Sequence, residues 1–334
     1  MKRHAIIPIF IPHLGCPHSC VFCNQKAITA RTADITEDDV RKTAEEYLST
    51  LDGITDVEMS FFGGSFTGIP IEKQGAFLKI AKEYKDAGRI SKIHLSTRPD
   101  YINREILDNL KYYGTDVIEL GVQSFDEDVL RLSERGHSRQ AVYDACILIK
   151  EYGFTLGIQL MIGLPGDSYK ACMDSVKRTI EIRPEIARIY PTVIITNTKL
   201  AEMYRKGTYS PFSQEETLRI AKDMYLSLTG AGINVIRVGL KASALINDSG
   251  ESDVLGETYH PAFRQLLESE IAKDIIEKEL QNKKELTVRA GAKMISNAVG
   301  HKRCNKTYFS EKYPESTIRF VADSSLEDSQ MIIE

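Results

Sequence analysis

Three cysteines near the start of the chain have a spacing that suits a metal centre. Cys16, Cys20 and Cys23 follow the pattern C-x3-C-x2-C. Three thiolates this close together converge on a soft metal centre and do not all pack as inert apolar side chains. A [4Fe–4S] cluster held by three cysteines keeps one iron open, and an open iron can bind a substrate or a second cofactor. The spacing therefore indicates a site for chemistry.

A structural zinc site is the alternative interpretation of these cysteines. Zinc needs four ligands, and His13 or His18 could supply the fourth. Structural zinc ligands usually come as two pairs, however, and Cys146, Cys172 and Cys304 are isolated in the sequence. We therefore favour the cluster and expect no auxiliary iron–sulfur centre.

The composition is typical of a soluble globular protein. Of 334 residues, 42% are hydrophobic and 27% are charged, with a formal net charge of −4. The chain thus lacks the global basic field of many nucleic-acid binders, and it has no apolar run of membrane-spanning length. The basic start and the short apolar run Ala5–Ile11 lead into Pro12 without a small-residue cleavage site. We expect a cytoplasmic protein, where reduced thiols suit a cluster.

Alternating strand and helix patterns must position the cysteines. Strands are predicted at Ala5–Ile11, Val57–Phe62, Lys92–Ser96, Val117–Val122, Thr155–Ile162 and Ala187–Val193. Amphipathic helices are predicted at Glu37–Leu51, Ile71–Ala87, Asn103–Tyr113, Ser138–Glu151 and Tyr169–Glu181. The fold class is α/β, and six such units fit a partial (β/α)6 TIM-like barrel with a parallel sheet and right-handed crossovers.

Residues with binding potential follow the predicted strands, where a barrel places its active site. The pair Gly63 and Gly64 lets the backbone approach a ligand closely, although it also fits an ordinary turn. The amide of Gln123 suits ribose hydroxyls. Arg135 can pair with a carboxylate as a planar fork, or it can be a solvated loop charge. Gly163 follows the fifth strand and allows close contact.

Taken together, these segments resemble the radical S-adenosylmethionine (SAM) enzymes. The resemblance implies that SAM chelates the fourth iron and is cleaved to methionine and a 5′-deoxyadenosyl radical, which abstracts a hydrogen atom. It implies Cys16, Cys20 and Cys23 as cluster ligands. It also implies the following SAM-contacting residues: Phe22, Gly63, Gly64, Ser65, Ser96, Gln123, Arg135, Gly163 and Leu164. Ser65 stands where the family usually has an acid.

Within this superfamily the chain most resembles the radical SAM portion of the elongator catalytic subunit and its short bacterial relatives. The likeness covers residues 1–195 as a barrel and continues through a C-terminal extension, 196–272, with predicted helices at Gln214–Thr229 and Ala262–Lys273 and a strand at Val235–Val238. Because these 334 residues are taken up by the barrel, the extension and the KH-like segment, we expect no counterpart of elongator's acetyltransferase domain among them. The extension is expected to lie as a lid over the open edge of the barrel. Residues that could face the substrate, although each alone is more typical of structure, are Tyr190, Arg237, Lys241 and His260.

The segment 273–322 is basic and resembles the core of a KH domain. Its predicted order is strand, helix, short link, helix, strand. The link Gly300, His301, Lys302, Arg303 resembles the Gly-x-x-Gly clamp for single-stranded nucleic acid, with Arg303 in place of the second glycine. Residues 273–319 hold eleven Lys/Arg against six Asp/Glu, a net charge of +5. A small α/β cap with a solvated charged surface is the alternative. We expect the acidic end, 323–334, to be a loose tail.

Three functional hypotheses follow. The first is a radical SAM enzyme that modifies RNA, with tRNA as the first choice and the KH-like segment presenting it to the barrel. The second is a radical SAM enzyme that acts on a small molecule, such as a tetrapyrrole or metabolite. The third is a metal-bearing RNA-binding adaptor without catalysis. Both enzyme hypotheses imply an electron donor of the flavodoxin or ferredoxin type, and none implies a membrane.

Overall fold

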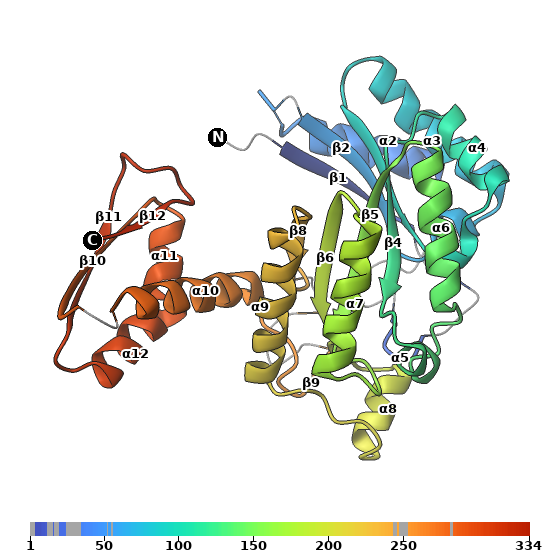
Figure 1. Ribbon diagram of the computed structural model, residues 1–334. Coiled ribbons are helices and arrows are strands. Elements are labelled where there is room, and N and C mark those ends of the chain that lie inside the picture. The colour runs from blue at the N-terminus through green and yellow to red at the C-terminus, as the bar shows by residue number, and fades with distance from the viewer. Residues whose placement is uncertain are drawn as a thin grey trace.

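A seven-stranded parallel sheet forms the centre of the computed structural model, which describes residues 4–11, 16, 20–24, 35–51, 53–54, 56–242, 246, 253–280 and 283–334. The strand order is β1-β2-β3-β4-β5-β6-β8. The strands are β1 (His4–Phe10), β2 (Asp56–Phe62), β3 (Lys92–Thr97), β4 (Val117–Gln123), β5 (Thr155–Ile162), β6 (Ile186–Pro191) and β8 (Asn234–Val238). The sheet curls into an open half-barrel (Figure 1), which confirms the predicted partial TIM-like barrel.

Most helices follow the strands and cover the outer face of the curled sheet (Figure 1). They are α2 (Glu37–Leu48), α3 (Ile71–Asp86), α4 (Arg104–Tyr112), α6 (Arg139–Glu151), α7 (Tyr169–Ile182) and α9 (Gln214–Gly230). Two short helices, α5 (Glu127–Leu132) and α8 (Lys199–Arg205), lie at one end of the sheet (Figure 1). Polar caps fix several starts, as when the Ser138 side chain accepts a hydrogen bond from the Ala141 amide. Five of these helices were predicted from the barrel sequence with shifts of a few residues at their ends, but α5 and α8 are too short for a periodic signal.

The predicted extension contributes a seventh strand to the sheet. Strand β8 pairs in parallel with β6, with Ile186 opposite Asn234, so this part continues the barrel and does not lie over it as a lid. The apolar pattern at Val235 and Val238 predicts a strand, but it carries no information about its partner. Strand β9 (Val254–Leu255) of the extension pairs in a small antiparallel ladder with β7 (Ile194–Ile195), which follows β6.

A separate C-terminal lobe is attached through the long helix α10 (Phe263–Leu280) (Figure 1). Phe263 and Leu267 pack in the main core, whereas Ile276 and Leu280 pack in the core of the C-terminal lobe. The predicted boundary between residues 272 and 273 therefore falls inside a continuous helix. None of the described helices is both long and apolar enough to cross a membrane.

The C-terminal lobe has the predicted order of strand, two helices and strand. Its elements are β10 (Glu285–Ala290), α11 (Met294–Val299), the 3-10 turn η3 (His301–Arg303), α12 (Cys304–Lys312), β11 (Thr317–Ala322) and β12 (Met331–Ile333). Strand β10 pairs in parallel with β11 and antiparallel with β12. The prediction of a loose acidic tail is therefore wrong, because Met331 and Ile333 pack against the apolar core of this lobe.

Candidate active site

A cavity of about 560 Å3 lies inside the half-barrel and brings most of the predicted site residues together. The described sequence-predicted residues on its wall are Cys16, Cys20, Phe22, Cys23, Gly63, Gly64, Ser96, Gln123 and Arg135. They lie in the segments that follow β1, β2 and β4, or at the carboxyl ends of β3 and β4 themselves. The carboxyl ends of parallel strands share one edge, and this common edge explains the convergence.

The described part of the cysteine segment is held by two other parts of the chain. The Val21 amide donates to the Ser133 carbonyl (3.1 Å), and the Leu200 amide donates to the Val21 carbonyl (2.7 Å). The Asn24 side chain donates to the Thr196 carbonyl (3.2 Å). Val21 also packs with Leu200 in a small apolar cluster. The segments after β4 and β6 therefore anchor the cysteine segment. The second of them belongs to residues 196–272, which were expected to form a lid.

Gly63 is required by a close backbone approach at the end of β2. Its φ of +87° is unfavourable for side chains, and a Cβ there would lie 2.6 Å from the Ile11 carbonyl oxygen. Ile11 directly follows β1, on the side of the cysteine segment, and its amide donates to the Phe62 carbonyl. Gly63 thus lets the stem of the cysteine segment lie against β2.

Gln123 ends β4 in a strained conformation beside the cavity. Its φ is +70°, and the ladder between β4 and β5 shifts register between Gly121 and Gln123. Gln159 donates to the Gln123 side-chain oxygen at 3.0 Å, which orients the amide. Bulges and left-handed residues are common next to active sites, where they redirect a side chain.

Two buried arginines flank the cysteines. Arg98 is 1% exposed and donates from Nε and Nη2 to the two carboxylate oxygens of Asp100, each at 2.9 Å. Arg135 donates from Nη2 to the Gly121 carbonyl at 2.6 Å and from Nη1 to Cys20 Sγ at 3.4 Å. Both line the cavity, so two cationic side chains share its wall with the thiol groups.

A buried ionic chain crosses the interior from β2 to β6. Glu58 accepts from His94 (2.7 Å), and Glu119 pairs with Arg188 (2.6 Å). Ser96 donates to Glu119 at 3.4 Å. Burial acts to raise the pKa of Glu58, but hydrogen bonds from His94 and Ser60 hold that pKa down at about 2. The Ser96 hydroxyl is therefore already engaged by a carboxylate that itself lines the cavity.

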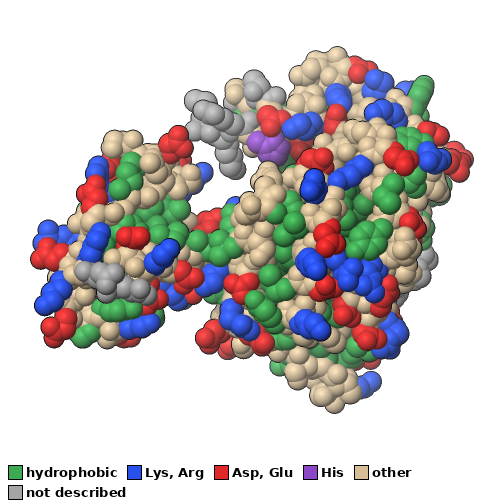
Figure 2. All heavy atoms as spheres, in the orientation of Figure 1, with side chains coloured by type: hydrophobic (Ala, Val, Ile, Leu, Met, Phe, Trp, Pro, Cys, Tyr) green, Lys and Arg blue, Asp and Glu red, His purple; other side chains and the backbone are tan. Residues whose placement is uncertain are grey.

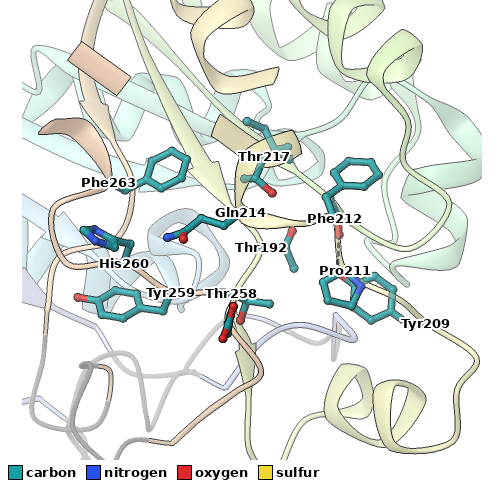
Figure 3. Close-up of a pocket in the computed structure, with 13 residues that line it drawn as sticks. Thr192, Tyr209, Pro211, Phe212, Gln214, Thr217, Thr258, Tyr259, His260 and Phe263 are labelled. Carbon is teal, nitrogen blue, oxygen red and sulfur yellow. Dashed lines mark hydrogen bonds between the residues drawn. The ribbon is translucent and has the colours of Figure 1, made fainter. Parts of the chain in front are cut away.

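Three predicted SAM-contacting residues lie away from this cavity. Ser65 is fully buried behind the wall, because its hydroxyl bonds the Thr97 hydroxyl at 2.8 Å. Leu164 packs in an apolar cluster with Val129. Gly163 lines a second, much smaller pocket, where its carbonyl accepts a hydrogen bond from the Tyr209 hydroxyl (Figure 3). Their predicted contacts with SAM stay predictions.

One candidate substrate-facing residue of the extension, His260, lines the smaller pocket. His260 lies beside Tyr259 on the wall of this smaller pocket (Figure 3). Tyr190, Arg237 and Lys241 line the main cavity instead. The candidate zinc ligands His13 and His18 lie outside the described residues.

Sequence reasoning missed four polar residues of the cavity wall: Arg98, Glu119, Gln159 and Arg188. Glu119, Gln159 and Arg188 are polar residues inside otherwise apolar strands. A charged residue within a buried strand is rare unless it is paired or functional. That signal was available, but the pairing of Glu119 with Arg188 joins residues 69 positions apart and needs the fold.

The donor set of the cavity suits a cluster. Cys16, Cys20 and Cys23 line one cavity, and thiolates are the ligands that iron–sulfur clusters take. The Arg135 guanidinium beside Cys20 is the positive charge that a thiolate ligand needs in a buried site. Cys16, Cys20 and Cys23 would hold the cluster.

Comparison with known proteins identifies the class. The profile of the Radical SAM superfamily matches residues 10–179, and the profile of the Radical_SAM C-terminal domain matches residues 184–273. The chain therefore belongs to the radical SAM superfamily, whose enzymes use a [4Fe–4S] cluster and SAM. This assignment confirms the resemblance predicted from the cysteine spacing.

The relatives are of the elongator type. The chain is 27% identical over 256 residues to the tRNA uridine(34) acetyltransferase of Methanocaldococcus infernus, covering 65% of this chain and 48% of that protein. It is 25% identical over 281 residues to human Elongator complex protein 3, covering 70% of this chain and 51% of that protein. The solved archaeal Elp3 of M. infernus shares the fold, with a TM-score of 0.64 at 21% identity over 85% of this chain and 65% of that one. The chain spans about half the length of these two curated relatives.

Proposed function

We propose that this radical SAM enzyme acts on RNA, with tRNA as the first substrate to test. The observation that carries the proposal is the position of the KH-like link. The ring of His301 in the link contacts the ring of His260 edge-on, with 5.3 Å between centroids. His260 lies in the segment before α10 that lines a pocket next to the end of β5. The link therefore contacts the segment that lines the pocket at the carboxyl end of β5.

The charge of the link supports a polyanionic substrate. Lys302, Arg303 and Lys306 are exposed, and no ion pair or side-chain hydrogen bond engages them within the described residues. Lys302 and Arg303 have φ values of +51° and +67°, and Gly300 has +84°. Left-handed conformations in three of four residues make a compact turn that projects its side chains outward. Such a turn offers cations to a phosphate backbone.

The cavity residues would do the cofactor work. Cys16, Cys20 and Cys23 would bind the cluster, and Gly63, Gly64, Ser96, Gln123 and Arg135 would position SAM. When bound and reduced, the cluster supplies the electron that cleaves SAM and so generates a 5′-deoxyadenosyl radical. A donor of the flavodoxin or ferredoxin type would deliver that electron. We place tRNA first among the RNA substrates to test because two relatives are named tRNA uridine(34) acetyltransferase.

The test compares substrates for their ability to accelerate SAM cleavage. The protein is reconstituted with iron and sulfide without oxygen, reduced, and assayed for 5′-deoxyadenosine with and without a total tRNA pool. We expect tRNA to raise the rate, and ribonuclease treatment of the pool to abolish the increase. Acceleration by a small metabolite fraction or a tetrapyrrole, with no response to tRNA, would contradict the proposal. The cavity volume of about 560 Å3 would also admit such a small substrate.

A further inference from the structure

Arg135 is a buried cation whose described contacts include no carboxylate. It is 6% exposed, and its terminal nitrogens donate to the Gly121 carbonyl and to Cys20 Sγ. The other two buried arginines of the cavity wall are each neutralised, Arg98 by Asp100 and Arg188 by Glu119. Arg135 therefore differs from both. Apart from the Gly121 carbonyl, the group that receives a hydrogen bond from its guanidinium is the sulfur of Cys20.

The surrounding backbone is built to aim this guanidinium. Arg135 lies between Glu134 (φ +51°) and Gly136 (φ +80°) in a tight turn closed by its own amide bonding the Leu130 carbonyl at 2.9 Å. A Cβ on Gly121 would lie 2.9 Å from Arg135 Nη2, so glycine there leaves space for the side chain. The same turn carries the Ser133 carbonyl that bonds the Val21 amide, next to Cys20. One segment thus fixes both partners of the contact.

We propose that Arg135 raises the reduction potential of the cluster by donating Nη1–H to the sulfur of Cys20. This inference rests on the cluster assigned above. A thiolate ligand becomes more electron-rich when the cluster gains an electron, so a positive donor stabilises the reduced state more than the oxidised one. Burial strengthens the effect because water does not screen the charge. Arg135 acts through Cys20 and is a positioning residue. The role differs from the predicted pairing of Arg135 with the SAM carboxylate, since it operates without SAM.

The experiment is a redox titration of the full reconstituted protein without SAM, followed by the electron paramagnetic resonance signal of the reduced cluster. The variants are Arg135→Gln and Arg135→Lys, and the matched control is Arg237→Gln, which removes a positive charge from the same cavity without touching a cysteine. We expect the equilibrium constant for one-electron reduction to fall about tenfold in Arg135→Gln, ~59 mV for a one-electron couple. Arg135→Lys keeps the charge but loses the planar guanidinium, so its equilibrium constant should fall less. Arg237→Gln should show the smallest fall in this constant.

Two outcomes would overturn the inference. One is an Arg135→Gln potential equal to that of the parent, together with weaker SAM binding, which would assign Arg135 to the SAM carboxylate. The other is an equal drop in Arg237→Gln and Arg135→Gln, which would show a general charge effect. If Arg135→Gln takes up no iron, the Arg135→Lys potential decides: a drop supports the inference and no drop overturns it. A parent protein that takes up no iron would instead refute the cluster itself.

Discussion

The barrel cavity and the C-terminal lobe carry charge in different ways. In the cavity, buried charges are few, and most of them are paired, as in Glu119 with Arg188, whereas Arg135 contacts no carboxylate among the described residues. In the lobe, the charges lie at the surface and alternate in sign, and Figure 2 shows both signs side by side on one face. The predicted charge of +5 for residues 273–319 drops to +1 over 273–334, because the returning end adds four acids: Asp323, Glu327, Asp328 and Glu334.

This difference shows which kind of sequence signal survives folding. A motif such as the three cysteines depends on local spacing, and its residues still share one cavity. A charge sum depends on which other segments fold back. Arg289, counted as a free cation, pairs with Asp323 and Glu334 of the returning end. Lys302, Arg303 and Lys306 stay exposed without an ion pair among the described residues, as do Lys278, Lys283, Lys284 and Arg319. The contact of the link with His260 is the reason to test the RNA hypothesis first at Lys302 and Arg303.

The largest expected effect is the loss of stability when a buried ion pair is broken, compared with the loss when a surface ion pair is broken. Arg188→Met would leave the Glu119 carboxylate buried without its cation, and we expect a loss of ~3–5 kcal/mol in the free energy of unfolding, measured with urea. The counterpart Arg289→Met in the lobe breaks a surface pair and should change stability far less. Adding Glu119→Gln to Arg188→Met should restore part of the loss. Equal losses for the two single variants would remove the distinction between the regions.

The next effect is a pH dependence that originates in the barrel. His137 is buried beside Arg135, and burial followed by that positive charge lowers its pKa to about 4. Because the unfolded chain binds this proton near pH 6.5 and the folded chain does not, stability is full above pH 6.5 and falls toward pH 4 by ~3 kcal/mol. Urea titrations between pH 4 and 7 measure it. His137→Gln should flatten this part of the profile, and an unchanged slope in the variant would contradict the account.

A third prediction compares glycines in the two regions. Gly63→Ala would place a Cβ 2.6 Å from the Ile11 carbonyl, and Gly300→Ala would place one 2.7 Å from the Asn305 amide nitrogen. Each should cost ~2 kcal/mol or more, since a backbone clash adds to left-handed strain. Gly53→Ala is the control, with φ +75° and nothing within 4 Å, and should cost ~1 kcal/mol. Thermal unfolding measures all three, and equal losses would refute the close approaches.

The smallest predicted effect concerns RNA binding by the lobe. The double variant Lys302→Glu, Arg303→Glu should weaken tRNA binding roughly tenfold and flatten its salt dependence, because phosphate contacts release counterions. Arg319→Glu is the control, and it changes the net charge by half as much as the double variant. Its neighbours Ile318 and Phe320 pack toward the helices of the lobe, so Arg319 faces the opposite side of the sheet. Weakening by Arg319→Glu that is half of the double variant's effect in free energy would show that only net charge matters.

The fold could be predicted further than the site. Regular alternation of apolar runs gave the strands, and Thr155–Ile162 matches β5 residue for residue. The pairing of β8 with β6 could not be predicted, because strand partners are set by the whole sheet. For the site, short motifs correctly predicted that Gln123 and Gly63 line the cavity. The Ser65 hydroxyl, in contrast, forms a hydrogen bond with Thr97, a partner 32 residues away in the sequence. Long-range side-chain bonds of this kind leave no local pattern.

The most direct measurement is the cleavage of SAM by the reconstituted, reduced protein, compared with Cys20→Ala. The account predicts 5′-deoxyadenosine from the parent, and loss of both the iron and the product in the variant, because Cys20 lines the cavity with the other two cysteines. The variant Cys146→Ala, at a buried position on α6, should keep both. A colourless parent that holds zinc and leaves SAM intact would contradict the central claim.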